Sequence, residues 1–310
     1  MRLKSALRRG VAAAVIAGIV VSSGIPAYAI QWNIADGDIT VKAGDAEGKN
    51  RVSQGEKENV EDTDTVITGK SEEHTVTIDT SGGKVDVTFD DLKIDVSGKK
   101  EGDGSGDGPT RESKAAVTVR GDHDATIELD GKNELKSGGG SAGLEKNDHE
   151  SSGKLTIKDD KGKDGSLTAE GGDGGAGIGG GYESGAGNIE ITGGTVKAVG
   201  GAGAAGIGGG VYGTGHDIEI SGGKVSATGG NANKNLDSSR PGAAGIGDGA
   251  GTGKGEIDPN APSNPNHIYI SGDAEVEAKA GASTGGKTAA IGGSYGEVPT
   301  EDLSDDEHKV

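Results

Sequence analysis

The stretch GAGIGGGYESGAGNIEITGGTVKAVGG (residues 175–201) decides how this chain folds, because close copies of it recur further along the sequence. The next copy is AAGIGGGVYGTGHDIEISGGKVSATGG (204–230), and two shorter ones begin at Ala243 and Ala289. Spacings of 29, 39 and 45 residues separate their shared isoleucines, which are Ile178, Ile207, Ile246 and Ile291. Spacing that grows by insertion while the core segments persist is typical of stacked repeats, whose loops lengthen outside the packed coils.

Each copy holds three short β-type segments, A-G-I-G, I-x-I and V-x-A. Alternation places Ile189 and Ile191 on one face of their segment, and Val196 and Ala198 on one face of the next. The glycine pair 193–194, like the equivalent pair 222–223, permits the positive φ that a sharp corner needs. Three strands per coil with glycine corners predict an all-β fold, a three-sided parallel β-helix (β-solenoid) in which stacked Ile and Val form one continuous core.

The sequence before residue 175 carries looser versions of the same pattern. Leu144, Leu155 and Leu167 match the three segments of one coil, and earlier apolar pairs such as Val117/Val119 and Val76/Ile78 predict further coils. We therefore expect β-helix repeats over residues 75–296 and capping strands with a loop over 30–74. Trp32, Ile34 and Ile39 would shield the N-terminal end, since a bare sheet edge invites pairing with other chains. The acidic stretch 297–310 is expected to form a flexible tail.

The N-terminus has the order of a secretory signal peptide over residues 1–29. An apolar run from Val11 to Val21 follows a basic start and ends before Ala27-Tyr28-Ala29, an A-x-A cleavage site. The run is shorter than the roughly 20 residues of a membrane span, so we expect cleavage and no membrane insertion afterwards. The protein is predicted to be secreted, extracellular or on a bacterial cell surface. The basic residues of the start are Arg2, Lys4, Arg8 and Arg9.

Composition narrows the classes of partner. The chain has no cysteine, so disulfides cannot stabilise it outside the cell. Its formal net charge of −19 would become −23 once the four basic residues of the signal peptide are removed. A surface of that charge repels nucleic acid and anionic lipid, and favours cations or neutral partners. Between the 63 glycines, β-branched residues recur in a regular pattern. This pattern argues against a disordered chain.

The repeats and the segments before them resemble a family of secreted bacterial right-handed parallel β-helix proteins with a polysaccharide-lyase-like fold, described as carbohydrate-binding domain proteins. The resemblance covers most of residues 75–296. It implies export, a right-handed coil and an extracellular polysaccharide or cell-wall glycan as partner. The segments that carry it are FDDLKIDV (89–96), KAAVTVRGDHDATIELDGKNELKSGGGSAGLE (114–145), GKLTIKDDKGKDGSLTAEGGDGGAGIGGG (153–181) and the later IGGG repeats.

Three tyrosines are the candidate ligand-binding residues. Tyr182, Tyr212 and Tyr295 follow the glycine run in three of the four repeats, with Ala250 near that place in the other. If the coils stack in register, the rings form a row, and an aromatic face can pack on the apolar face of a sugar. The alternative is a structural ladder in which each ring covers a glycine corner.

A possible Ca²⁺ site is the segment Asp103-Gly-Ser105-Gly-Asp107-Gly108, which matches the first half of a calcium loop. The twelfth position is Lys114 rather than a carboxylate, so a flexible acidic loop is the alternative. No cofactor is required by any motif.

The sequence favours a non-catalytic carbohydrate-binding protein. A structural or adhesive cell-surface protein is the alternative, and a polysaccharide lyase is a third hypothesis. A lyase would need a base beside calcium-binding carboxylates, for which Arg120 near Asp122 and Asp124 is the candidate. The histidines show no zinc-ligand spacing and no nucleophile–base arrangement. The sequence does not indicate an oligomeric state.

Overall fold

A computed structural model of the protein describes residues 30–98, 114–162, 164–232, 242–251, 267–283 and 287–295. The predicted signal peptide, the predicted tail and the candidate calcium loop with Asp103, Ser105 and Asp107 lie outside these residues. No helix within them is long and apolar enough to cross a bilayer.

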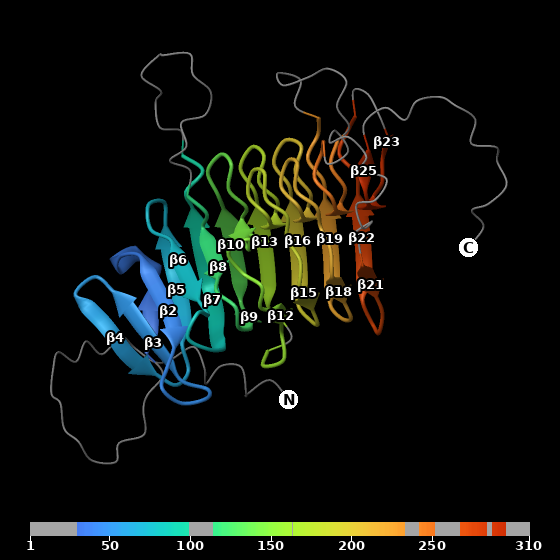
Figure 1. Cartoon of the computed structure of the whole chain (residues 1–310). Coiled ribbons are helices and arrows are strands. Elements are labelled where there is room, and N and C mark those ends of the chain that lie inside the picture. The colour runs from blue at the N-terminus through green and yellow to red at the C-terminus, as the bar shows by residue number, and fades with distance from the viewer. Residues whose placement is uncertain are drawn as a thin grey trace, which may run out of the picture.

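The described chain is a stack of short parallel strands that recur in chain order (Figure 1). The three segments of the sequence repeat form three columns. Column 1, built from the A-G-I-G segments, contains β2 (Ile39–Ala43), β6 (Val76–Asp79), β8 (Val117–Arg120), β11 (Leu144–Glu145), β14 (Ile178–Gly179), β17 (Ile207–Gly208), β20 (Ile246–Gly247) and β24 (Ile291–Gly292).

Columns 2 and 3 both begin at β7 (Val85–Asp95). Column 2, built from the I-x-I segments, continues with β9 (Ala125–Asp130), β12 (Leu155–Lys158), β15 (Ile189–Ile191), β18 (Ile218–Ile220) and β21 (Ile268–Ile270). Column 3, built from the V-x-A segments, continues with β10 (Lys132–Lys136), β13 (Ser166–Glu170), β16 (Thr195–Val199), β19 (Lys224–Thr228) and β22 (Glu275–Lys279). The first half of β7 pairs with β9 and the second half with β10, so the two columns belong to one sheet.

The strand register places equivalent residues of successive repeats opposite one another, and their inward side chains form the core. Ile191 pairs with Ile157 on one side and Ile220 on the other, and all three are fully buried. In column 3, Val196 pairs with Val225 and is 1% exposed. Each inward side chain is therefore covered by its equivalents in the repeats above and below. The predicted all-β repeat of parallel strands is confirmed.

Glycine has two separate roles in the stack. At the corner between columns 2 and 3, the second glycine of each pair adopts a left-handed backbone, with φ of +84° at Gly194 and +79° at Gly223. After β17 the reason is contact: a Cβ on Gly210 would lie 1.9 Å from the carbonyl oxygen of Gly181 in the preceding repeat. Gly194 and Gly223 thus supply a backbone angle, and Gly210 allows the backbones of two repeats to approach closely.

The N-terminal end is covered by an antiparallel hairpin, a 3-10 turn and two strands that pair in parallel. Trp32 is buried there, and its indole Nε1 donates to Oδ2 of Asp62 over 2.7 Å. Ile34 is buried in the 3-10 turn, and Ile39, expected in the cap, is buried in β2 of column 1. The elements are β1 (Gln31–Asn33), the 3-10 turn η1 (Ile34–Asp36), the hairpin strands β3 (Asn50–Gln54) and β4 (Lys57–Asp62), and β5 (Val66–Ser71), which pairs with β1 and β7. At the other end, β23 (Lys287–Thr288) pairs antiparallel with β25 (Ser294–Tyr295).

Candidate functional site

The turn that follows each column 1 strand carries the candidate tyrosines. Backbone hydrogen bonds establish which positions correspond. The N–H groups of Tyr182, Val211 and Ala250 donate to glycine carbonyls of a preceding repeat at 2.7, 2.9 and 2.7 Å. These three residues therefore occupy one position, and the acceptors are Gly140, Gly174 and Gly203.

Tyr212 occupies the next position along the turn, where the preceding repeat has Glu183. The N–H of Glu183 donates to the Val211 carbonyl at 2.8 Å, and that of Tyr212 donates to the Ala250 carbonyl at 2.9 Å. Tyr182 and Tyr212 therefore occupy positions that differ by one residue along the turn. Counting from the isoleucine of each repeat reveals the offset in the sequence itself, because Tyr182 is four residues after Ile178 and Tyr212 is five after Ile207.

The two rings nevertheless meet. Their centroids lie 6.0 Å apart at an interplanar angle of 85°, an edge-to-face contact. The Tyr182 ring lies against Gly174, where an added Cβ would come within 2.7 Å of the ring. Tyr182 is 41% exposed, so the pair is open to solvent. We call Tyr182 and Tyr212 the tyrosine pair.

Tyr212 reaches its partner from a costly backbone conformation. Its φ is +64°, a left-handed value that is rare for bulky residues. In the following repeat, Gly251 corresponds to Tyr212. Its φ is +87°, which glycine adopts without strain. Glu183, at the equivalent position of the preceding repeat, has a φ of +59°, so the left-handed angle belongs to this turn in all three repeats.

A carboxyl group and an amide lie beside the tyrosine pair. Glu145 Oε2 accepts a hydrogen bond from the Ala142 N–H at 3.0 Å, and a Cβ on Gly181 would come within 2.9 Å of the same oxygen. Asn147 Oδ1 accepts from the Gly181 N–H at 2.8 Å. Burial raises the pKa of Glu145. An exposed aromatic face with polar groups beside it is the combination that suits a polyhydroxylated ligand.

Two other residues singled out in the sequence, Tyr295 and Arg120, lie on β25 and β8. Only the backbone of Tyr295 is described. Arg120 pairs with Asp79, with 3.1 Å between Nη2 and Oδ2, rather than with Asp122 or Asp124. Across the described ranges, no group of three or more His, Cys, Asp or Glu side chains is placed to hold a metal ion.

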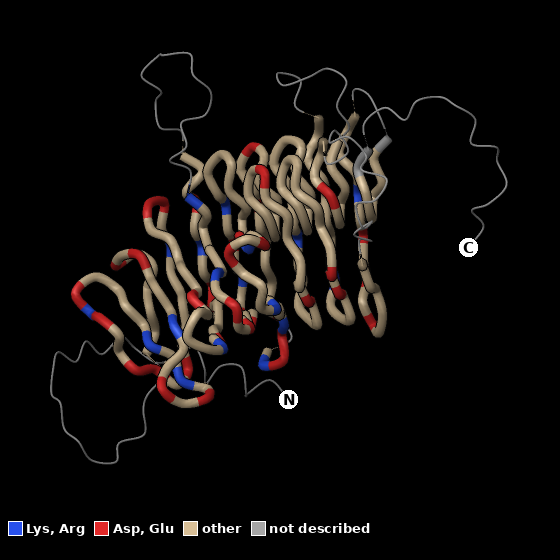
Figure 2. Tube along the Cα trace, viewed as in Figure 1, with Lys and Arg blue, Asp and Glu red and all other residues tan. Residues whose placement is uncertain are grey.

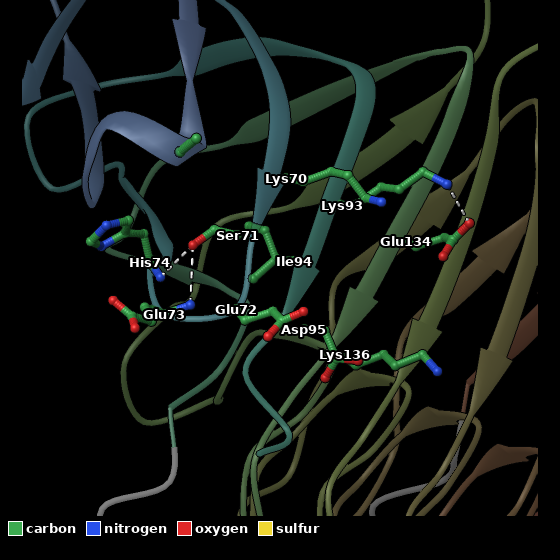
Figure 3. Close-up of a pocket in the computed structure, with 11 residues that line it drawn as sticks. Lys70, Ser71, Glu72, Glu73, His74, Lys93, Ile94, Asp95, Glu134 and Lys136 are labelled. Carbon is green, nitrogen blue, oxygen red and sulfur yellow. Dashed lines mark hydrogen bonds and ion pairs between the residues drawn. The ribbon is translucent and has the colours of Figure 1, made fainter.

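A charged hollow of about 600 Å³ lies on a different part of the molecule, where β5, β7 and β10 run side by side (Figure 3). Its lysines have acidic neighbours: Lys93 Nζ lies 2.8 Å from Glu134 Oε1, and Lys136 Nζ lies 3.1 Å from Glu170 Oε2. Sequence reasoning missed this hollow because its residues come from three separate coils. The charged residues that line it are Lys70, Glu72, Glu73, His74, Lys93, Asp95, Glu134 and Lys136.

A second arrangement that the sequence did not reveal joins two of the scattered histidines. His216 lies between Asp148 and Asp217, with 2.9 Å from its Nε2 and Nδ1 to the two carboxylates. His267 Nδ1 lies 3.1 Å from the other oxygen of Asp217. Close by in the chain, the buried Lys146 donates to the carbonyl of Gly187 at 2.8 Å. These polar contacts connect the repeats along the edge where column 1 turns into column 2.

Comparisons with known proteins found no match. No family model matches the chain, no curated protein is significantly similar to it, and no solved structure matches it. The geometry defines a repeat-built all-β scaffold with a solvent-exposed tyrosine pair on one of its turns.

Proposed function

We propose that this protein is a secreted, non-catalytic carbohydrate-binding protein that recognises an extracellular polysaccharide through the tyrosine pair. The observation that carries the proposal is the edge-to-face contact of Tyr182 and Tyr212 at 6.0 Å, with Tyr182 41% exposed. Tyr212 holds its ring there at the cost of a φ of +64°.

The surroundings of the pair favour a neutral sugar over a polyanion or a cation. Figure 2 shows that charged residues crowd the N-terminal half of the stack and thin out over the later repeats. Between Gly171 and Gly215 the charged residues are Asp173, Glu183, Glu190 and Lys197 only. Such a surface offers rings, amides and backbone groups with few fixed charges, of which Glu145 and Glu183 lie beside the pair.

The same proposal includes a three-sided cross-section, a right-handed coil and export from the cell. Each repeat contributes one strand to each of three columns, which supports a three-sided cross-section. The resemblance to secreted right-handed β-helix proteins supports a right-handed coil, which is also the usual hand of parallel crossovers. The basic start, apolar run and A-x-A site of residues 1–29 support export.

Affinity electrophoresis through gels containing neutral and acidic polysaccharides tests the function. We expect the native protein to be retarded by at least one neutral polysaccharide, and Tyr182→Ala to weaken the affinity about threefold to tenfold, the range of an aromatic contact. Tyr212→Gly is the sharper variant, because it removes the ring and also relieves the left-handed backbone. It should bind less without unfolding at a lower temperature.

The matched control is Tyr269→Ala, because Tyr269 is 59% exposed on β21 and lies outside the pair. Parallel gels with Ca²⁺ and with a chelator test whether the candidate loop at Asp103–Asp107 contributes. Unchanged migration of the native protein on every polysaccharide would overturn the proposal. Equal losses in the control and in Tyr182→Ala would remove the tyrosine pair as its site.

A further inference from the structure

The C-terminal end of the stack differs from its interior in the exposure of equivalent residues. Ile220 in β18 is fully buried, whereas Ile270, its register partner in β21, is 42% exposed. Val276 and Ala278 of β22 are half-buried, although their partners on β19 are buried. In the described part of the chain, no strand pairs with the outer side of β21 or β22. Among the described residues, this end therefore presents apolar side chains and strand edges that no strand pairs with, which we call the open edge.

The N-terminal end does not complement the open edge. Its outermost hairpin strand, β4, exposes Lys57, Glu58 and Glu61, and the indole of Trp32 is buried behind it. Stacking one molecule head-to-tail on another would cover apolar side chains with a charged hairpin. A contact between two identical open edges avoids that mismatch and closes with two-fold symmetry.

The chain's own last residues also lack the pattern that the open edge would accept. Columns 2 and 3 use I-x-I and V-x-A, and neither occurs between residues 297 and 310. That segment carries six acidic residues and one lysine, and its apolar residues Val298, Leu303 and Val310 do not alternate. The pattern of this segment therefore does not match the segments of the repeat.

We propose that the open edge is the interface between two copies of this protein, formed by antiparallel pairing of β22 with β22 of the partner. Val276 and Ala278 must face inward in both copies, so the register is centred on Glu277. Glu275 of each copy then lies opposite Lys279 of the other. Two such opposite-charge pairs outweigh the single exposed Glu277–Glu277 contact at the axis.

Sedimentation velocity over a range of protein concentrations tests this interface. We expect the native protein to shift from one to two copies as concentration rises. Glu275→Lys and Lys279→Glu should each abolish the shift, since each places like charges opposite one another. The double variant, which exchanges the two charges, should restore it.

Two further variants test whether association depends on the open edge itself. Lys197→Glu changes an exposed charge on β16, two repeats inside the stack, and should leave association unchanged. Ile270→Lys should abolish association while circular dichroism shows an unchanged fold. Glu275 also lies 3.9 Å from Lys224 of its own chain, so the thermal unfolding of each variant is compared in the same buffers.

Three results would contradict the proposed interface. A native protein that stays monomeric throughout, or a double variant that associates no better than the single ones, would overturn the proposal. Association gained only after removal of residues 297–310 would show that the chain covers its own edge.

Discussion

The Nε2 atom of His216 lies 2.9 Å from Oδ2 of Asp148, although 68 residues separate the two in the sequence. Its Nδ1 lies 2.9 Å from Oδ2 of Asp217, so two carboxylates hold opposite sides of one imidazole. Two such acceptors require both ring nitrogens to carry protons. Asp148 follows β11 and His216 precedes β18, so the ring ties together repeats that are not neighbours in the stack.

This contact predicts a specific loss of stability with rising pH. The hydrogen bond to Asp148, with that to Asp217, raises the pKa of His216 to about 9, against an opposing effect of burial. An unfolded histidine titrates near 6.5. The contribution is therefore fully present below about pH 6.5 and is lost as the pH rises through about 9.

His216→Gln should lower the free energy of unfolding by on the order of 2 kcal/mol at pH 6 and by much less at pH 9.5. Urea denaturation at both pH values measures the difference. His149→Gln is the control, since the His149 side chain is 64% exposed and lies 3.7 Å from Glu150. Equal destabilisation by His216→Gln at both pH values would contradict the assignment.

Lys146 predicts a pH dependence of the opposite sign. Its Nζ donates to the carbonyls of Ser151 and Gly187 at 3.0 and 2.8 Å, and the residue is fully buried. Burial lowers the pKa of Lys146 to about 8, although Asp148 acts to raise it. Between about pH 8 and the unfolded value of about 10.4 the unfolded state holds more protons, so this group makes the native state more stable as pH rises.

In Lys146→Met that rise should be missing. The stability of the variant relative to the native protein should fall by on the order of 2 kcal/mol between pH 7.5 and pH 10.5, measured by urea denaturation. Lys197→Met, on an exposed strand face, provides the control. Parallel stability profiles for Lys146→Met and the native protein would show that the amine titrates as it does in the unfolded chain.

Gly210→Ala tests the close approach of neighbouring repeats. Because its Cβ would lie 1.9 Å from the Gly181 carbonyl oxygen, the backbone of one repeat must move. We expect a loss of at least about 2 kcal/mol, seen as a lower midpoint in thermal and urea unfolding. Gly139→Ala is the matched control, as nothing lies within 4 Å of its added Cβ, and it should change stability by less than about 0.5 kcal/mol. Similar effects of the two substitutions would refute the packing argument.

Trp32→Phe should destabilise the N-terminal cap by about 1–3 kcal/mol, since it removes the donor that contacts the 3% exposed Asp62. Chemical denaturation of the double variant Trp32→Phe/Asp62→Leu provides the check. Removing both polar partners should recover part of the loss, because no buried carboxylate is then left without its donor. A double variant whose loss equals the sum of the two single losses would argue against a coupled pair.

Much of the fold could be predicted from the sequence, because the signals are local. Strand alternation places Ile189 and Ile191 on the same face whatever surrounds them, and the glycine pair 193–194 marks a corner through its backbone angle. Even the offset between Tyr182 and Tyr212 is present in the count of residues after each isoleucine.

The candidate site could be predicted only in part. The sequence identified the tyrosines, but the distance between their rings depends on the φ of Tyr212 and on the turn of the next repeat. The charged hollow requires Lys70, Lys93 and Glu134 to lie side by side, and residues so far apart meet only through the pairing of β5, β7 and β10.

The sequence by itself determined the strands, the corners and the inward faces of the repeat, because each depends on residues a few positions apart. Only the tertiary structure decided which polar groups meet: the imidazole of His216 between two carboxylates, Lys146 inside the stack, and an apolar edge left open at β21 and β22. The physical reason is that stacking joins side chains from coils tens of residues apart. Loop lengths and register then determine which of them come within hydrogen-bonding distance.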